Sequence, residues 1–158
     1  RFDQVDRVLW QLKNEPNSRR IMTNLYIPQD LHEMNLYPCA HSVTFNVEGH
    51  KLNAILNQRS QDMLTANNWN VVQYTALVYM LAQVNNLEPG KLIHVIANAH
   101  IYDRHIALVR ELVQNEQYEA PDLNIDYKVD NFYDFTLGDF ALYNYQFSDF
   151  KHKIPVAI

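Results

Sequence analysis

The residues of this chain that could do chemistry begin with its only cysteine, Cys39, which follows Pro38 and precedes Ala40 and His41. A thiolate is a strong nucleophile, but a lone cysteine is more often a small buried apolar residue. Cys39 therefore either packs in the core or attacks a substrate with partners supplied by the fold. On a strand, His41 would point to the same face as Cys39, so a cysteine–histidine pair is conceivable.

Two further polar clusters stand at the ends of expected strands. The first is QRSQD at 58–62, and the second is NAHIY at 98–102. Because α/β domains assemble their sites at strand ends, we expect both clusters to lie near Cys39.

Each polar residue in these clusters also has a purely structural interpretation. Arg59 and Asp62 could form a local ion pair, and His100 and Tyr102 could cap and pack the helix that follows them. Asn70 could be a helix N-cap, a position where asparagine is strongly favoured. Residue type alone does not decide between these interpretations and a functional site.

Several classes of site find no support in the sequence. The spacing of His94, His100 and His105 matches no zinc-ligand pattern, three glycines form no phosphate loop, and no GxSxG stretch marks a hydrolase. A net charge of −5 without a basic stripe argues against nucleic acid as the main partner. No window approaches eighteen uninterrupted apolar residues, so we expect no membrane span.

The elements that must position these residues mix helices and strands. The 158 residues are 47% hydrophobic and 12% aromatic, which suits one globular domain with an aromatic core. Helices are expected at 5–13, 70–86 and 102–114, and strands at 20–26, 42–47, 51–57, 92–97 and 123–129, with a turn at 48–50 and an aperiodic aromatic stretch at 132–142. The helix at 70–86 is apolar almost all round, so we expect it to be buried. This mixture predicts a single α/β or α+β domain.

Taken in order, these segments resemble the thymidylate synthase family, which methylates dUMP to dTMP with a folate. The resemblance runs from Asp3 to the last residue. Its motifs are VLWQLKNEPNSRRI (8–21), LYPC (36–39), QRSQD (58–62), WNVVQY (69–74), HIY (100–102) and PVAI (155–158). It implies a mixed sheet packed with helices and used for homodimerisation. It also implies methyltransferase activity with 5,10-methylenetetrahydrofolate as cosubstrate, no metal, and no membrane.

The resemblance implies roles for residues around the nucleophile and the phosphate. Cys39 would attack C6 of the uracil ring, and the neighbouring guanidinium of Arg59 would favour the thiolate. Arg59 and Ser60 would also bind the nucleotide phosphate. Arg19 and Arg20 would reach the same phosphate from the other subunit, a task that suits the planar guanidinium fork.

Further implied roles concern the base, the sugar and the folate. Asn70 would pair with the uracil edge, where related deoxycytidylate hydroxymethylases carry aspartate. His100 and Tyr102 would hold the deoxyribose hydroxyl. Asp62 would contact the folate pterin, and the tail with Ala157 would close over the folate and exclude water. The predicted catalytic set is Cys39, Arg59, Asp62 and Asn70, and the predicted dUMP-binding set is Arg19, Arg20, Arg59, Ser60, Gln61, Asp62, Asn70, His100 and Tyr102.

The chain also departs from the family pattern. Ala40 stands where histidine usually follows the cysteine, and His41 is shifted by one residue to the opposite strand face, so it does not replace that histidine. Residues 65–68 read TANN instead of Leu-Gly-x-Pro, and Asn144 replaces a common glycine. The family's N-terminal segment, with a phosphate-binding arginine and a catalytic glutamate, has no counterpart here. We therefore expect 1–158 to be the C-terminal catalytic portion of one domain, inactive or nearly so alone.

Two alternatives stay open at this point. One is a pyrimidine-nucleotide hydroxymethylase, against which Asn70 argues, and comparing dUMP with dCMP binding would separate it. The other is a nucleotide-binding or dimerisation module without turnover, which would bind and dimerise without Cys39 chemistry. One cysteine excludes an internal disulfide and fits a reducing compartment, so a cytoplasmic location is expected.

Overall fold

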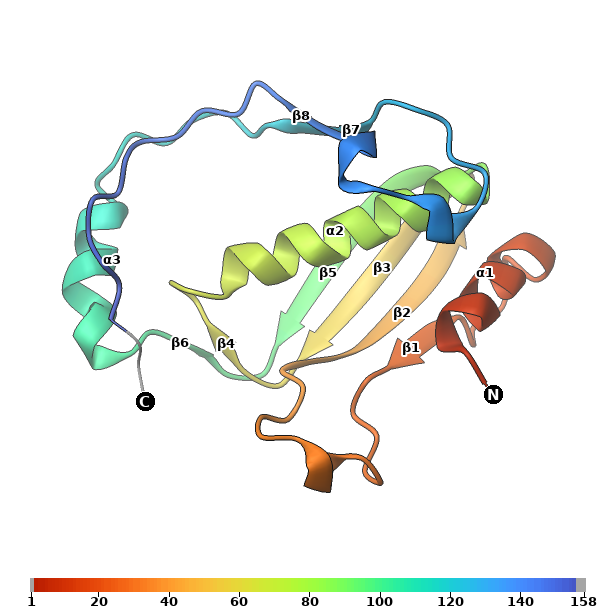
Figure 1. Cartoon of the computed structure of the whole chain (residues 1–158), viewed down its shortest axis with the longest axis horizontal. Coiled ribbons are helices and arrows are strands. Elements are labelled where there is room, and N and C mark those ends of the chain that lie inside the picture. The colour runs from red at the N-terminus through yellow and green to blue at the C-terminus, as the bar shows by residue number, and fades with distance from the viewer. Residues whose placement is uncertain (1, 156–158) are drawn as a thin grey trace.

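A four-stranded mixed sheet and one long helix organise the chain, which the computed structural model describes over residues 2–155. The strand order is β1 (Met22–Asn24), β2 (Ala40–Glu48), β3 (Lys51–Gln58) and β5 (Glu88–Ile96). The first three strands pair antiparallel, and β5 pairs parallel with β3. Helix α2 (Asn67–Val84) crosses one face of this sheet (Figure 1). The prediction of a mixed α/β fold is therefore confirmed.

The β2–β3 hairpin supplies the centre of the core. Apolar residues recur at every second position, which directs them to the face that α2 covers. Gly49 at the turn has a φ of 61°, a left-handed conformation that glycine adopts without a steric cost. The predicted hairpin is confirmed. The buried apolar residues are Val8, Leu12, Ile21, Val43, Phe45, Leu52, Ala54, Leu56, Tyr74, Val78, Leu81 and Ala82.

Helix α1 (Gln4–Asn14) packs beside β1 and extends the predicted helix by one residue at each end. Asp3 caps its first turn, because the carboxylate accepts a hydrogen bond of 2.8 Å from the Val5 amide. Val8 and Leu12, four residues apart on one helix face, are buried in the core. The amphipathic pattern of this segment thus predicted both its structure and its buried face.

Helix α2 is less buried than its composition suggests. Tyr74, Val78 and Leu81 face the sheet, but Trp69 and Val72 are 79% and 62% exposed. The prediction of a helix buried all round is therefore wrong for the face turned away from the sheet. The helix itself begins three residues before the predicted position and ends at Val84.

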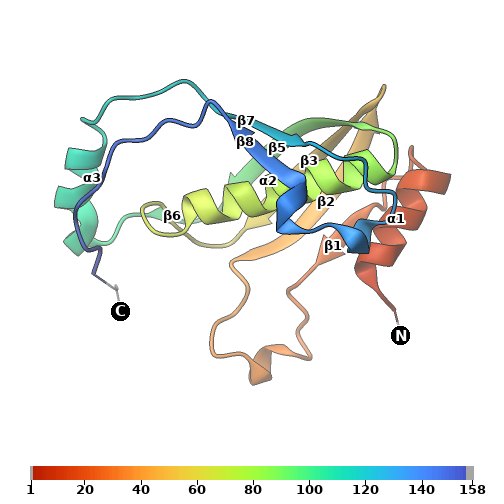
Figure 2. The same ribbon diagram turned by 45° about the horizontal axis from the view of Figure 1, so that its top comes forward.

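The C-terminal third of the chain forms shorter elements than predicted. The expected helix at 102–114 is a 3-10 turn followed by a two-turn helix, and the expected strand at 123–129 ends at residue 125. Figures 1 and 2 show this third arching over α2, with β7 and β8 side by side and an extended stretch returning to α3. Its elements are η2 (Asp103–His105), α3 (Ile106–Leu112), β7 (Asp122–Ile125), η3 (Phe132–Asp134), η4 (Leu137–Asp139) and β8 (Phe140–Tyr143).

No element within residues 2–155 packs on the sheet face opposite α2 (Figure 1). Cross-strand neighbours Met22, Thr44, Ile55 and Ile93 form one row across this open sheet face, and Val95 lies two residues further along β5. Met22, Ile93 and Val95 are between 46% and 49% exposed. An apolar sheet face of this kind is typical of an interaction surface.

Candidate active site

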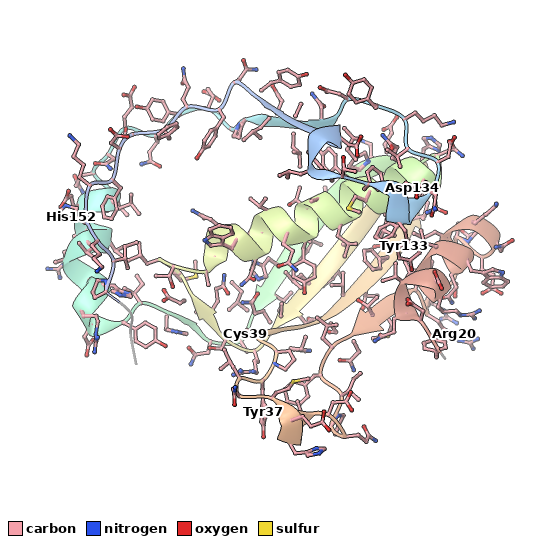
Figure 3. All side chains as sticks on the ribbon, viewed as in Figure 1. Arg20, Tyr37, Cys39, Tyr133, Asp134 and His152 are labelled. Atoms are coloured by element: carbon pink, nitrogen blue, oxygen red, sulfur yellow. The ribbon has the colours of Figure 1, made fainter. Side chains whose placement is uncertain are left out.

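Cys39 lies where a long loop enters the sheet. The loop carries the 3-10 turn η1 (Leu31–Glu33) and projects away from the sheet in both views, and Figure 3 places Tyr37 and Cys39 together at its return to β2. The Cys39 carbonyl accepts a 2.9 Å hydrogen bond from the Arg59 amide, which joins the start of β2 to the end of β3. The cysteine is half-buried and carries a free thiol.

The Arg59 side chain is fixed by the same loop. Its Nε donates to the Pro38 carbonyl at 3.0 Å, and its Nη2 donates to the Tyr37 carbonyl at 2.7 Å. The same Nη2 lies 3.8 Å from Cys39 Sγ, within hydrogen-bonding distance for sulfur. A cationic N–H donor at this position stabilises negative charge on sulfur. Arg59 thus binds the loop at Tyr37–Cys39, called the cysteine loop below. The alternative of an Arg59–Asp62 ion pair is wrong.

Two predicted clusters meet through a short parallel strand pair. Strand β4 (Gln61–Asp62) pairs with β6 (Ala99–His100), because the Gln61 amide donates to the Asn98 carbonyl at 2.9 Å and the Met63 amide donates to the His100 carbonyl at 3.0 Å. The hydrogen bond from the Arg59 amide to the Cys39 carbonyl joins the third cluster, at Pro38–Cys39, to these two. All three polar clusters therefore converge, as expected for strand ends.

Asp62 is held as an acceptor by its own turn. Its Oδ1 accepts from the Leu64 and Thr65 amides at 3.0 and 3.2 Å, and its Oδ2 accepts from the Thr65 hydroxyl. Partial burial raises the pKa of Asp62, but these hydrogen bonds outweigh it and bring the pKa below its usual value, with a small contribution from His105. The side chain is ionised near neutral pH and can accept N–H groups from a ligand.

Asn70 lies inside the first turn of α2, so the N-cap interpretation is wrong. The helix begins at Asn67, and its N-cap is Ala66. The Asn70 side chain instead donates through Nδ2 to Gln61 Oε1 at 2.8 Å. Gln61 is 1% exposed, and its own Nε2 donates to Asn67 Oδ1 at 3.3 Å. Gln61 therefore contacts Asn70 from the protein interior.

Gln58 and His94 belong to this arrangement. Sequence reasoning placed Gln58 in the cluster at 58–62 without giving it a role, and it did not connect His94 with that cluster. Gln58 is 2% exposed, its Nε2 donates to the Ser60 carbonyl at 2.9 Å and to Gln61 Oε1, and its Oε1 lies 2.8 Å from His94 Nε2. Burial lowers the pKa of His94, which keeps the ring neutral. A signal was present: Gln58 continues the alternation of Leu52, Ala54 and Leu56 at a buried position of β3. Glutamine at such a position needs partners.

His100 and Tyr102 lie at the surface of the same cluster. His100 Nδ1 lies 3.0 Å from Asn98 Oδ1, and its ring packs edge-on against Tyr102 with centroids 5.1 Å apart. Because Nδ1 is engaged by the Asn98 oxygen, Nε2 is the ring nitrogen left for a ligand. Tyr102 is 39% exposed. The pair can hold a hydroxyl group. Tyr102 also occupies the N-cap position of η2 without a side-chain capping bond, and its ring packs edge-on against His105 with centroids 5.8 Å apart, so the packing part of the structural interpretation is confirmed.

Arg19 and Arg20 are not brought to Cys39 within this chain. Both are exposed, and Figure 3 shows Arg20 beside α1, far along the sheet from Cys39. Met22 pairs with Thr44, so Arg20 lies beyond Thr44 on the side opposite to Cys39. Thr44 lies five positions after Cys39, about 17 Å along an extended chain. Ala157, predicted to close over the folate, lies outside the described residues.

The departure at Ala40 coincides with an irregularity in β2. The register with β3 shifts between Ala40 and Ser42, as at a β-bulge. His41 packs edge-on against Tyr26, with centroids 6.4 Å apart, and lines a hollow of about 420 Å³ with Arg59. Among residues 2–155, no hydrogen bond joins His41 to Cys39, so nothing supports a cysteine–histidine pair.

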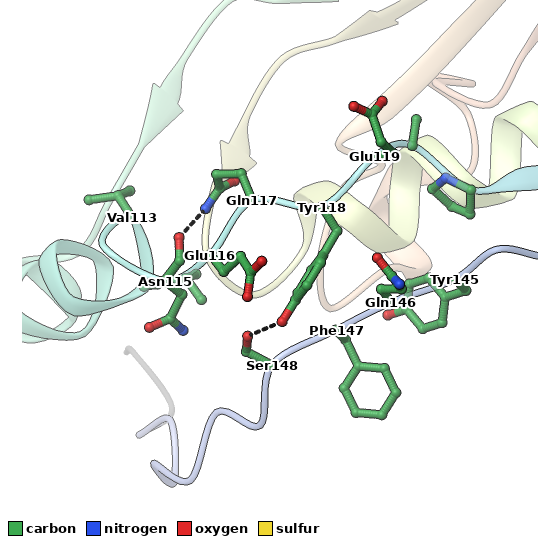
Figure 4. A pocket seen from close by; sticks show the side chains of 13 residues that line it. Val113, Asn115, Glu116, Gln117, Tyr118, Glu119, Tyr145, Gln146, Phe147 and Ser148 are labelled. Carbon is green, nitrogen blue, oxygen red and sulfur yellow. Dashed lines mark hydrogen bonds between the residues drawn. The ribbon is translucent and has the colours of Figure 1, made fainter.

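A large cavity lies elsewhere, between the end of α3 and the extended C-terminal stretch. It measures about 480 Å³, and Tyr118 and Ser148 bridge it with a 3.0 Å hydrogen bond (Figure 4). None of the predicted site residues lines it. Across the described residues, no group of three His, Cys, Asp or Glu side chains could hold a metal ion, and no helix is long and apolar enough to cross a membrane.

The chain is similar to known proteins in both sequence and structure. The thymidylate synthase family model matches residues 1–158. Thymidylate synthase 1 of Bacillus spizizenii is 44% identical over the whole chain, which covers 56% of that protein, and thymidylate synthase 1 of Bacillus amyloliquefaciens is 44% identical over 157 residues. The structure of thermostable thymidylate synthase A from Bacillus subtilis superimposes with a TM-score of 0.94 at 44% identity, with 100% of this chain and 56% of that chain covered. The chain thus spans about half the length of the first of these relatives.

Proposed function

Because the chain belongs to the thymidylate synthase family, we propose that it carries the nucleophile and pyrimidine-binding part of an enzyme that converts dUMP to dTMP. The arrangement of Arg59 supports this proposal most strongly. The loop carbonyls of Tyr37 and Pro38 fix the guanidinium, and its Nη2 lies 3.8 Å from Cys39 Sγ. Such a donor prepares a thiolate for attack.

The chemical step follows from that thiolate. Cys39 Sγ adds to C6 of the uracil ring, a C–S bond forms, and the electron pair of the C5–C6 double bond moves toward C5 and O4. Carbon 5 thereby becomes a nucleophile. After C5 has gained the one-carbon unit and hydride that the folate would supply and has lost its proton to a base, the electron pair on C5 re-forms the C5–C6 double bond. The C–S bond then breaks, and its electron pair returns to sulfur.

The nucleotide would lie across the joined clusters. Arg59 and the Ser60 hydroxyl bind the phosphate, since both lie at the end of β3 beside the cysteine loop. His100 and Tyr102 hold the deoxyribose hydroxyl, and the oxygen and remaining N–H of Asn70 pair with the uracil edge. The side-chain direction of Asn70 favours uracil over the cytosine of a hydroxymethylase substrate.

Asp62 fits the folate. An ionised carboxylate with a lowered pKa is a suitable acceptor for the N–H groups of a pterin. When bound, 5,10-methylenetetrahydrofolate would supply the one-carbon unit and the hydride that turn C5–H into C5–CH₃. The role of Ala157 in covering the folate stays a prediction. A reducing cytoplasm would keep the Cys39 thiol free.

A second copy of the chain would cover the open sheet face. On this sheet face, the large apolar side chains of Met22, Ile93 and Val95 are exposed. Arg19 and Arg20 lie outside the reach of their own Cys39, which agrees with a role at the phosphate of the other subunit. Pairing of the two open sheet faces would bury the apolar row and bring these arginines to the partner.

Intact mass spectrometry tests this proposal. The chain is mixed with 5-fluoro-dUMP and 5,10-methylenetetrahydrofolate. The fluorine stands at C5 in place of the proton that the reaction must remove, and a base cannot remove it, so the covalent adduct persists. We expect a mass increase equal to both ligands, absent in Cys39→Ser and retained in the control Ser148→Ala. An adduct on Cys39→Ser would overturn the role of Cys39, and an unmodified chain that neither forms an adduct nor binds dUMP would overturn the proposal as a whole.

A further inference from the structure

Four polar side chains form a continuous hydrogen-bonded chain from β5 to α2. His94 binds Gln58, Gln58 binds Gln61, and Gln61 binds Asn70. Gln58 and Gln61 are 2% and 1% exposed, so water cannot substitute freely for a lost partner. Only the last member, Asn70, reaches the position proposed for the pyrimidine.

The direction of this hydrogen-bonded chain is fixed by a backbone group. The Ser60 carbonyl can only accept, so the Gln58 atom 2.9 Å from it is the amide nitrogen. Gln58 Oε1 then faces His94 Nε2 at 2.8 Å and accepts a hydrogen bond from its N–H. The remaining Gln58 N–H donates to Gln61 Oε1. The orientation of each amide is thus set by its neighbour, beginning from the backbone.

Gln61 passes this direction to Asn70. Gln61 Oε1 accepts from Gln58 and also from Asn70 Nδ2, while Gln61 Nε2 donates to Asn67. If the Asn70 amide turned by 180°, its Oδ1 would face Gln61 Oε1, and two acceptors would meet without a proton in a buried site. That arrangement is unfavourable. Asn70 is therefore held with Oδ1 and one N–H directed outward in a fixed order.

We propose that Gln61 is a positioning residue that selects uracil over cytosine by locking the orientation of the Asn70 amide. The inference rests on the proposed function and deepens it. Uracil presents an N3–H donor and an O4 acceptor, which match the locked Asn70. Cytosine presents an N3 acceptor and an amino donor, which need the turned amide. The lock acts by penalising the competing base.

Binding of dUMP and dCMP to Gln61→Met tests the lock. Methionine keeps the length of glutamine but removes the acceptor, so Asn70 can turn. We expect dUMP affinity to fall and dCMP affinity to rise, with the ratio of the two dissociation constants shifting about tenfold. A purely structural defect would weaken both nucleotides together. Gln61→Glu keeps an acceptor toward Asn70 and should retain most of the preference, and Gln114→Met on the surface should change nothing.

These outcomes distinguish a failure of the proposed function from a failure of the Gln61 lock. If the unmodified chain binds neither nucleotide, the proposed function fails. If it prefers dUMP and folded Gln61→Met keeps the same ratio within twofold, the lock fails. Gln58→Met, which frees Gln61 to turn, should shift the ratio in the same direction and serves if Gln61→Met does not fold.

A measurement on the unmodified chain needs no variant. In side-chain amide NMR, we expect the Nε2 protons of Gln58 to exchange with water at least about tenfold more slowly than those of exposed Gln114. Equal exchange rates would overturn the lock, because a fixed buried donor cannot exchange like a surface amide.

Discussion

Arg59 and the pair Arg19–Arg20 have the same chemistry and opposite surroundings. Arg59 is half-buried and donates to two loop carbonyls beside Cys39 Sγ. Arg19 and Arg20 are exposed at the turn before β1, and within residues 2–155 their side chains form no ion pair. The chain therefore holds one cation in place for its own cysteine and presents two others outward.

We infer from this difference how the proposed site is divided between two subunits. A cation that must stabilise a thiolate needs a fixed position, and the β2–β3 junction supplies it through backbone acceptors. Cations that bind a phosphate from across an interface need exposure until the partner arrives. Their position next to the open sheet face agrees with that need. Substitutions should therefore affect the two regions differently.

The largest effect is expected from Arg59→Ala. It removes the donor to Sγ and leaves the Tyr37 and Pro38 carbonyls without their partner, so the rate of adduct formation should fall at least about a hundredfold. Arg59→Lys keeps the charge without the planar fork, so its rate of adduct formation should lie between those of Arg59→Ala and the unmodified chain. Arg110→Ala, at an exposed arginine of α3, is the matched control. A rate within threefold of the unmodified chain in Arg59→Ala would remove Arg59 from the mechanism.

A smaller effect is expected from Asp62→Asn. Like Arg59, Asp62 is a charged residue held in place by hydrogen bonds within its own chain. The folded pKa of Asp62 lies below its usual value of 3.8, so the carboxylate stabilises the fold above that pH. The stabilisation is lost as the pH falls through the folded pKa. We expect Asp62→Asn to lower the free energy of unfolding by about 1 kcal/mol at pH 7, and less at pH 3.

Urea titrations at both pH values measure this difference. Asp130→Asn is the control, because the one ion pair of Asp130 within residues 2–155 is with exposed Lys128, at 3.3 Å. A loss for Asp62→Asn that is equal at pH 3 and pH 7 would contradict a role for the ionised carboxylate.

The sequence predicted the parts of the molecule whose patterns are local. Alternation at 42–47 and 51–57 and the glycine between them specify the hairpin, and the spacing of Val8 and Leu12 specifies α1. Motifs at strand ends placed three clusters together correctly. The resemblance of those motifs to a family identified that family.

The remaining features depend on contacts between distant residues. Burial of α2 was overestimated because apolar composition does not say which face the sheet covers. The Gln58–His94 contact joins residues 36 positions apart, and it forms only because β3 and β5 pair in parallel. The bulge near Ala40 likewise depends on the register with β3. Such features follow from pairing, which composition and spacing do not encode.

The most direct test of this division mixes two variants. Arg19→Ala/Arg20→Ala keeps Cys39 but lacks the outward cations, and Cys39→Ser keeps the cations but cannot form an adduct. We expect the first variant alone to form little adduct with 5-fluoro-dUMP and 5,10-methylenetetrahydrofolate. Co-expressed with Cys39→Ser, it should regain adduct at its own mass, because the partner supplies Arg19 and Arg20. If co-expression leaves its adduct yield unchanged, these arginines do not act across an interface.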